Sequence, residues 1–245
     1  MKAAFFDIDG TLFRNSLLIE HFKKLIKYEV IDIAVWIEEV RDPFHNWSLR
    51  QGDYEMYLLD VSRAFKDSLK GKDTQVIEFI SKQVIKMNWE KTYVYTRQRL
   101  NWHQEQGHGV FFISGSPDFL VSRMARKYSA TDFRASTYIM EKDLFTGEVI
   151  PMWDYESKEK AILELVGQYG IDLDLSYAYG DTSGDLTMLR MSGHPFAMNP
   201  NQKLFEEIMN DESLKEKVEI VVERKDMIYS LKPKDVKHPG IVTNY

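Results

Sequence analysis

The sequence predicts an α/β fold, with a doubly wound, Rossmann-like parallel sheet and a second, smaller domain made of helices. Three short apolar runs, at 3–6, 110–113 and 175–179, each lead into polar or acidic residues. Segments with helical periodicity separate these runs, and strands joined by helical crossovers pair in parallel. A long helical segment after the first strand, residues 15–87, predicts the second domain.

Composition is typical of a soluble globular protein. The 245 residues are 44% hydrophobic and 29% charged, enough for a full core. The formal net charge is -6 and there is no long basic run, so nucleic acid is not expected as a partner. The absence of cysteine excludes disulfides and thiolate metal ligands. The first strand follows Met1 without a signal-peptide pattern, and we expect a cytoplasmic protein.

One apolar stretch outside the strands bears on membrane binding. Residues 30–37 are too few to span a bilayer and include Asp32, so they predict a buried or cap-lining helix. Trp36 and the nearby lysines would suit a bilayer surface, which leaves interfacial attachment open. A membrane partner is nevertheless not expected.

The helical segment shows hydrophobic residues at helical spacing in several stretches between residues 18 and 84. Breaks are predicted at Asp42-Pro43 and at residues 70–73, where either Thr74 or Asp73 can cap the next helix. The predicted domains are therefore a core of residues 1–14 and 88–245 and a helical cap of residues 15–87.

Helices and strands alternate along the rest of the chain, as a parallel sheet requires. We expect, in order, a helix over 89–106, a strand ending at Ser114, a helix over 117–128, an extended segment over 133–140 with a hairpin turn at Thr146-Gly147, a helix over 158–169, a strand ending at Gly180, a helix over 185–191, and strands over 195–198 and 218–222. Residues 233–245 are polar, include Pro and Gly, and predict a loosely held tail.

Two carboxylates follow the first apolar run, in Asp7-Ile8-Asp9-Gly10. Because side chains alternate along an extended chain, Asp7 and Asp9 lean to the same side. There they can share a cation or divide the roles of nucleophile and proton donor. Gly10 lets the backbone turn sharply beside a bound group. Acidic residues are also common in strand-to-loop turns, so this motif alone does not establish catalysis.

Two other strands also end in residues suited to chemistry. Ser114-Gly115-Ser116 follows one strand and the acidic segment 180–185 follows another, with Lys158 as a candidate cation between them. The carboxyl ends of strands in an open parallel sheet form one rim, where ligands bind. The three strand ends therefore predict a single site.

Taken together, four motifs resemble those of the haloacid dehalogenase (HAD) superfamily of phosphotransferases. They are DxDGT at 7–11, the strand ending in Ser114, Lys158, and GDxxxD at 180–185. The resemblance covers nearly the whole chain, and residues 15–87 stand where the superfamily places a small cap domain. The cap position and GDTSGDLTML at 180–189 are most similar to the phosphoserine phosphatase-like group. The resemblance implies a HAD-type core and a phosphoric monoester hydrolase.

The resemblance also implies the catalytic roles. Asp7 would attack phosphorus and form an aspartyl-phosphate that water later hydrolyses. Asp9 would protonate the leaving alcohol and then deprotonate the attacking water, which favours phosphoryl transfer over dehalogenation. Mg²⁺ would be held by Asp7, the main-chain carbonyl of Asp9, and Asp181.

The phosphoryl group would be held by residues of the second strand end. Ser114 and the amide of Gly115 would bind its oxygens, as hydroxyls and strand-end amides do for anions. Lys158 would offset the negative charge, with Lys160 as a nearby competitor for that role. The structural alternative for Lys158 is a solvated lysine that opens a helix.

Three further residues are expected to support the site. Asp185 would orient Asp181 rather than bind the metal, and a carboxylate at a helix N-terminus is the alternative interpretation. Gly10 would allow the turn, and Thr11 satisfies backbone groups of the loop.

The cap bears on the substrate. In phosphoserine phosphatases an acidic residue nine positions after the nucleophile holds the substrate amine, and a cap arginine holds its carboxylate. This chain has Ser16 and Val61 at the corresponding positions, so phosphoserine is not expected as the substrate. Aromatic residues of the cap are expected mainly in its core, although some could line the cleft: Trp36, Phe44, Trp47, Tyr54, Tyr57 and Phe65.

We therefore expect a magnesium-dependent phosphatase that acts on a small phosphorylated metabolite. One alternative is a phosphotransferase or phosphomutase, in which a sugar hydroxyl replaces water. A lipid-phosphate phosphatase is suggested only by residues 30–37, and a catalytically silent phosphate-binding module is the alternative outside enzymes. The sequence determines neither the substrate nor the oligomeric state.

Overall fold

The structure is a computed structural model that describes residues 1–49, 51–52 and 54–236. Within these residues eight strands form one sheet, in the order β4-β3-β2-β1-β5-β6-β7-β8. The strands are β1 (Ala3–Phe6), β2 (Gly109–Pro117), β3 (Asp132–Glu141), β4 (Leu144–Ile150), β5 (Tyr177–Gly180), β6 (His194–Met198), β7 (Glu219–Arg224) and β8 (Met227–Leu231).

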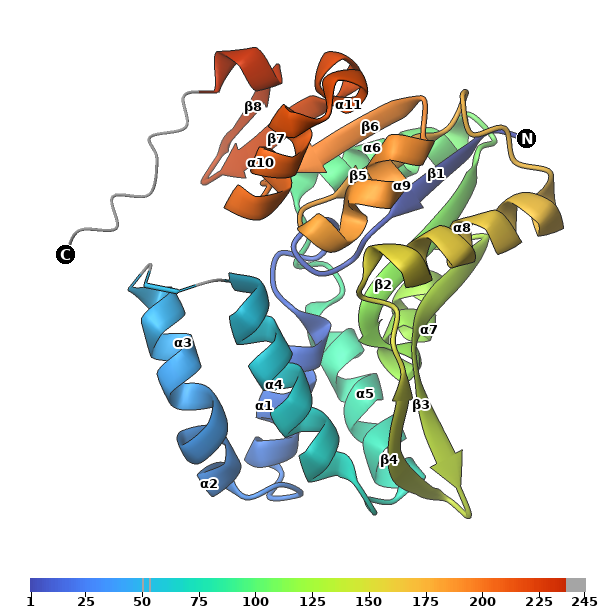
Figure 1. The fold of residues 1–245 in the computed structure, drawn as a ribbon. Coiled ribbons are helices and arrows are strands. Elements are labelled where there is room, and N and C mark those ends of the chain that lie inside the picture. Colours follow the sequence, from blue (N-terminus) through green and yellow to red (C-terminus); the bar gives the residue numbers. More distant parts are fainter. Residues whose placement is uncertain (50, 53, 237–245) are drawn as a thin grey trace.

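The sheet is parallel except at its two edges. The pairs from β3 through β7 are parallel, whereas β4 and β8 each pair antiparallel with the strand before them in the chain. Helical crossovers join the parallel strands and cover both faces (Figure 1): α6 (Val94–Glu105), α7 (Asp118–Lys127), α8 (Tyr155–Tyr169), α9 (Leu186–Met191), α10 (Gln202–Asn210) and α11 (Glu212–Lys217). The predicted doubly wound α/β fold is confirmed.

Alternation along the strands divides the interior into two hydrophobic clusters. Phe6 and Phe112 belong to the cluster that includes α6 and α7, whereas Phe5 and Phe111 belong to the cluster that includes α8 to α11. All four rings are buried. Because neighbouring side chains of a strand point to opposite faces, consecutive phenylalanines serve both layers at once.

The segment after β1 is helical, as predicted. It contains α1 (Leu17–Lys27), α2 (Ile33–Val35), a π-helix η1 (Trp36–Val40), α3 (Arg41–Ser48), α4 (Tyr54–Leu69) and α5 (Thr74–Asn88). These helices lie together at the lower left of Figure 1, below β7 and β8 and beside β3 and β4. The predicted break before α5 is correct, because the Asp73 carboxylate accepts the Gln75 N–H at 2.6 Å and caps the helix. Among the described helices, none combines the length and the apolar character that a membrane span requires.

The break predicted at Asp42-Pro43 is wrong, because α3 runs through Pro43. The π-helix η1 precedes α3, and the N–H of Arg41 donates to the carbonyl of Trp36, five residues back. Pro43 lies in the first turn of α3, where its missing N–H is tolerated. The wider π turn therefore lets the chain stay helical where the proline predicted a stop.

The hairpin turn predicted at Thr146-Gly147 is also misplaced. The β3–β4 turn is Lys142-Asp143, and both residues have positive φ, 50° and 64°, as a tight hairpin turn requires. Helices α10 and α11 and strand β8 were not predicted. Residues 233–235 form a 3₁₀ turn, and residues 237–245 of the predicted tail lie outside the described part of the chain.

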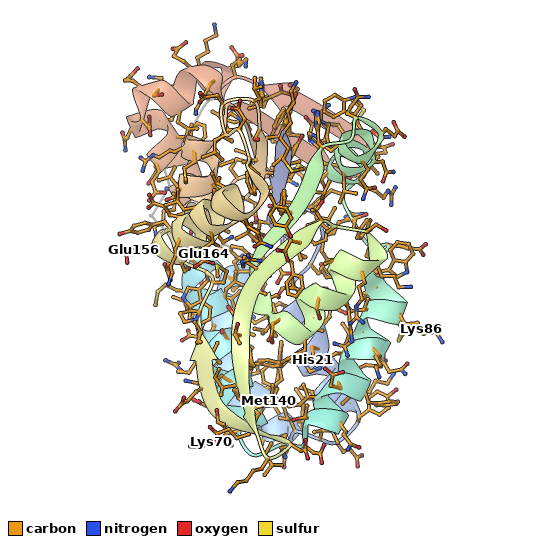
Figure 2. The ribbon with its side chains drawn as sticks, turned by 90° about the vertical axis from the view of Figure 1, so that its right-hand side faces the viewer. His21, Lys70, Lys86, Met140, Glu156 and Glu164 are labelled. Atoms are coloured by element: carbon orange, nitrogen blue, oxygen red, sulfur yellow. The ribbon has the colours of Figure 1, made fainter. Side chains whose placement is uncertain are left out.

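The β3–β4 hairpin is bound to the loop between α4 and α5. The N–H of Phe145 donates to the carbonyl of Lys72 at 3.0 Å, and the N–H of Thr74 donates to the carbonyl of Asp143 at 2.8 Å. Figure 2 shows Lys70 and Met140 at this end of the molecule. One hydrophobic cluster therefore continues from the sheet into the helices, through Phe145 and Tyr138.

Candidate active site

The sheet register brings together the three strand ends that were predicted to form one site, those of β1, β2 and β5. Strand β1 is central, with Phe6 opposite Phe112 of β2 on one side and opposite Tyr179 of β5 on the other. The next residue, Asp7, donates its N–H to the Tyr179 carbonyl at 3.0 Å. Asp7 therefore lies between the chain segments that carry Ser114 and Asp181.

Three carboxylates and one ammonium form a buried cluster there. Oxygens of Asp7, Asp181 and Asp185 all lie within 4.8 Å of one another. The Lys158 Nζ is 2.8 Å from Asp7 Oδ1 and 2.5 Å from Asp185 Oδ1, and its side chain is only 3% exposed. Lys160, the competitor considered from the sequence, is exposed on the same helix. The geometry thus places Lys158 at the site.

Asp185 organises the segment after β5. Its Oδ2 accepts the N–H groups of Asp181 at 3.0 Å and Thr182 at 3.1 Å, while its Oδ1 accepts from Lys158. A Cβ on Gly180 would lie only 2.3 Å from the Asp185 Cβ. These contacts agree with the expectation that Asp185 orients Asp181, although Asp185 also lies within the acidic cluster.

Gly10 and Thr11 support Asp181 from the first loop. The Thr11 hydroxyl donates to Asp181 Oδ1 at 2.8 Å. Gly10 has a φ of +84°, and a Cβ there would lie 2.1 Å from Asp181 Oδ2. A side chain at position 10 is therefore excluded both by backbone conformation and by the approach of the carboxylate.

The Asp9 carboxylate is held apart from the acidic cluster by three donors. It accepts the N–H of Leu17 at 3.0 Å and the hydroxyls of Ser16 at 2.9 Å and Ser116 at 2.7 Å. Burial raises the pKa of Asp9, and these hydrogen bonds oppose the rise only in part. No role was predicted for Ser116, which lies two residues after Ser114 in β2, at the point where the β2–β3 register shifts.

The charges of the buried cluster do not balance. Burial raises the pKa of Asp7 to about 8, more than the charge of Lys158 lowers it. Burial also raises the pKa of Asp181, and the nearby Asp7 and Asp185 carboxylates raise it further. Burial lowers the pKa of Lys158, but Asp185 and Asp7 outweigh this effect and hold it above its ordinary value.

With every group of the cluster ionised, three carboxylates face one ammonium, which leaves two negative charges in excess. A divalent cation would neutralise that excess. Because all candidate ligand atoms are oxygens, the donor set fits a hard cation such as Mg²⁺.

A cavity of about 720 Å³ opens beside these groups. Asp7, Asp9, Ser114, Gly115 and Lys158 line the end of the cavity next to the acidic cluster. Ser16 and Val61, which stand at the positions expected for the phosphoserine handles, also line the cavity. The six aromatic residues of the helical segment that were considered from the sequence do not line it and instead pack on other rings, as in the stacked Trp47–Tyr57 pair at 5.3 Å.

Glu55 of α4 links the helical segment to the loop after β5, a role that no sequence pattern indicated. One carboxylate oxygen accepts the Ser183 N–H at 3.1 Å and the Asn201 amide at 2.9 Å. The other accepts from Lys203 at 2.9 Å. Burial alone would raise the pKa of Glu55, but these hydrogen bonds hold it below its ordinary value. The partners lie more than a hundred residues away in the chain, so no local pattern could reveal them.

Comparison with known proteins identifies the family. The profile of haloacid dehalogenase-like hydrolases matches residues 4–190, which include every predicted site residue. The chain belongs to this family. The predicted superfamily is therefore confirmed, and with it the prediction that the protein is an enzyme of the hydrolase class.

Individual relatives of this HAD-like hydrolase agree with that assignment. A probable phosphatase of Mycobacterium tuberculosis is 28% identical over 207 residues, which cover 84% of this chain and 71% of that protein. Two solved structures share the fold. One is a protein of unknown function from Bordetella pertussis, with a TM-score of 0.69 and 17% identity over 86% of this chain and 96% of that one. The other is a phosphoserine phosphatase with a phospho-aspartyl intermediate analogue, with a TM-score of 0.59 and 21% identity over 92% and 94%.

Proposed function

We propose that this HAD-like hydrolase is a magnesium-dependent phosphatase that hydrolyses a small phosphorylated metabolite through an aspartyl-phosphate on Asp7. The main support is that the two carboxylates of the first loop lie in different surroundings. Asp7 lies in the buried cluster with Lys158, whereas Asp9 is held separately on three hydrogen-bond donors. Nucleophilic attack and proton transfer need two such distinct carboxyl groups. We also propose residues 15–87 as the cap domain over the core of residues 1–14 and 88–245.

Asp7, Asp181 and the main-chain carbonyl of Asp9 would hold the metal ion. When bound, Mg²⁺ would supply positive charge that offsets the acidic cluster and polarises the phosphoryl group. Ser114, the amide of Gly115 and Lys158 would hold the phosphoryl oxygens, because they line the same end of the cavity.

In the first step an Asp7 carboxylate oxygen attacks phosphorus, and the bond between phosphorus and the leaving alcohol oxygen breaks. The proton of the Asp9 carboxyl group passes to that oxygen. The raised pKa of Asp9 favours the protonated form that this step requires.

In the second step water attacks the phosphorus of the aspartyl-phosphate and gives its proton to the Asp9 carboxylate. The bond between phosphorus and the Asp7 oxygen then breaks, which releases inorganic phosphate and restores both carboxyl groups. The Ser16 and Ser116 hydroxyls keep Asp9 in place for both transfers.

Replacement of the nucleophile tests the proposal. With Mg²⁺ and a panel of phosphomonoesters, Asp7→Asn is expected to lower kcat by about a thousandfold or more, because the amide cannot accept phosphorus. Acid-quenched wild-type enzyme is expected to yield a phosphorylated peptide that contains Asp7. The matched control, Asp226→Asn, changes an exposed aspartate in the β7–β8 turn and is expected to keep full activity.

Full activity of a folded Asp7→Asn enzyme would reject the mechanism. Absence of hydrolysis by the wild type over the whole panel would instead favour the silent phosphate-binding module. Transfer of phosphate to added sugar alcohols in preference to water would identify a phosphotransferase.

A further inference from the structure

The cavity is much larger than a phosphate group. Its volume of about 720 Å³ is in the range of sites that enclose a drug-sized ligand. Asp7, Ser114 and Lys158 line the phosphoryl end, and helices α1 and α4 contribute to the rest. The remaining space is therefore available to the alcohol part of the substrate.

Helix α4 presents a regular stripe to this space. Glu55, Leu58, Leu59 and Ser62 all line the cavity, and their spacing of three or four residues places them on one helix face. Helix α1 adds residues from its first turn. The aliphatic residues of this wall are Leu18, Ile19, Leu58, Leu59 and Val61.

The wall's strongest polar groups already have partners in the protein. The Ser16 hydroxyl donates to Asp9 at 2.9 Å and accepts the N–H of Ile19 at 3.4 Å. The carboxylate of Glu55 accepts from Ser183, as well as from an amide and an ammonium group of the α10 region. Neither side chain is thus available to bind a charged group of a substrate without loss of these bonds.

Trp153 faces the same cavity from the segment before α8. Its position is constrained by two glycines, since a Cβ on Gly115 would lie 3.0 Å from the Trp153 Cβ and one on Gly184 would lie 2.3 Å from the Trp153 carbonyl oxygen. The indole, 40% exposed, adds a rigid apolar surface to the cavity.

We propose that the substrate is the monophosphate ester of an apolar alcohol, whose uncharged alkyl or ring body packs against the aliphatic wall of α1 and α4. This inference rests on the phosphatase function proposed above. A charged group placed against these aliphatic side chains would lose its hydration, and hydrocarbon offers it no hydrogen-bond partner, whereas methylene or ring groups gain from leaving water.

Away from the phosphoryl end, α9 and α10 contribute three charged residues to the cavity lining, Arg190, Lys203 and Glu207. Arg190 is paired with Asp211 at 2.6 Å, and Lys203 with Glu55 at 2.9 Å. Glu207 differs, because its Oε2 is buried without a hydrogen-bond partner among the described residues. Burial raises the pKa of Glu207, which favours its neutral form. A cationic substrate held by Glu207 is the competing possibility that the experiment has to separate.

A series of straight-chain alkyl phosphates, from methyl to octyl, tests the proposal with Mg²⁺ present. We expect kcat/KM to rise about two- to fourfold per methylene until the cavity is filled. Butyl phosphate is expected to exceed both 4-aminobutyl phosphate and phosphoserine by about tenfold or more, because burial of the ammonium group is unfavourable.

Two leucine variants test whether the aliphatic wall causes the rise of kcat/KM with chain length. Leu58→Asn is expected to lower kcat/KM for hexyl phosphate by about tenfold and to flatten the dependence on chain length. Leu59→Asn, at a more exposed position of the same stripe, serves as a second variant if Leu58→Asn does not fold. The control Leu163→Asn changes an exposed leucine of α8 outside this cavity and is expected to keep the full series.

The outcomes separate the two proposals. If no ester is hydrolysed, the phosphatase function and this inference both fail. If 4-aminobutyl phosphate is preferred and Glu207→Gln removes the preference, the enzyme is a phosphatase with a cationic substrate and the apolar alcohol is wrong. A flat chain-length series in an active wild type would also overturn the inference.

Discussion

His21 is a buried titratable side chain that the catalytic mechanism does not use. It lies on α1 in the helical part of the molecule (Figure 2), with Nε2 3.1 Å from the Ser81 hydroxyl and 3.3 Å from the Ile77 carbonyl. Its Nδ1 has no partner within the described residues. Burial lowers the pKa of His21 from 6.5 to about 3, so the ring stays neutral in the folded protein.

This pKa predicts a loss of stability in acid. Below pH 6.5 the unfolded chain binds a proton at His21 that the folded chain does not bind until about pH 3. Between pH 7.5 and pH 5 the free energy of unfolding is therefore expected to fall by about 2 kcal/mol from this residue. In His21→Gln that part of the fall should disappear, as measured by urea unfolding at the two pH values.

His45→Gln provides the control, because His45 is exposed on α3. It should retain the wild-type difference between the two pH values. An unchanged difference in His21→Gln would show that another group, such as the buried His103, accounts for the acid sensitivity.

Helix α4 packs into the hydrophobic core with one face and lines the cavity with another. Tyr57, Ala64 and Phe65 are buried in the hydrophobic cluster, while the stripe that begins at Glu55 faces the cavity. Glu55 also fixes the start of the helix to the loop that carries Asp181, through the N–H of Ser183. The position of α4 and the conformation of the loop that carries Asp181 are thus connected through one carboxylate.

Removal of that carboxylate is expected to loosen the loop. In Glu55→Ala the amide of Ser183 loses its acceptor, and its hydrogen exchange should become about tenfold faster, since a hydrogen bond to a charged group contributes about 1.5 kcal/mol or more. Glu78→Ala is a matched control, because Glu78 of α5 pairs with Arg123 of α7 away from this loop. Equal exchange at Ser183 in all three proteins would disprove the coupling.

At the scale of the whole molecule, the helical segment and the sheet share one hydrophobic interior. Phe65 of α4 is fully buried and contacts Tyr138 of β3, with ring centroids 6.1 Å apart. Phe22 of α1 and Phe145 of β4 belong to the same cluster. Because burial is continuous across the proposed domain boundary, we expect the described chain to unfold as one cooperative unit.

Phe65→Ala tests this expectation. The cavity left by the ring should lower the free energy of unfolding by about 3–5 kcal/mol. Tryptophan fluorescence and far-ultraviolet circular dichroism should still report a single coincident transition. Phe79→Ala, at a ring on α5 that is 51% exposed, should cost about 1 kcal/mol or less. Separate transitions for the two signals would indicate that the helical segment unfolds on its own.

Local sequence patterns predicted most helices and strands correctly. They failed at two places where a residue typical of a break or turn lies inside a helix or a strand. The apolar runs before Asp7, Ser114 and Asp181 form β1, β2 and β5. The break at Pro43 was wrong because the π turn before it supplies an alternative hydrogen-bond pattern. Gly147 predicted a turn, yet Lys142-Asp143 forms it; Gly147 keeps its positive φ of 93° within β4, so its conformational freedom is used inside the strand and not at the turn.

The sequence by itself determined the α/β class and the helical insertion, and it predicted Asp7, Asp9, Asp181 and either Lys158 or Lys160 as site residues, because strand ends and motif spacing are local properties of the chain. Only the tertiary structure decided that Lys158, and not Lys160, bridges two carboxylates. It also decided which side chains hold Asp9 and which ones form the aliphatic wall of the cavity. These contacts join residues far apart in sequence, and packing of the folded chain fixes them in a way that no short pattern encodes.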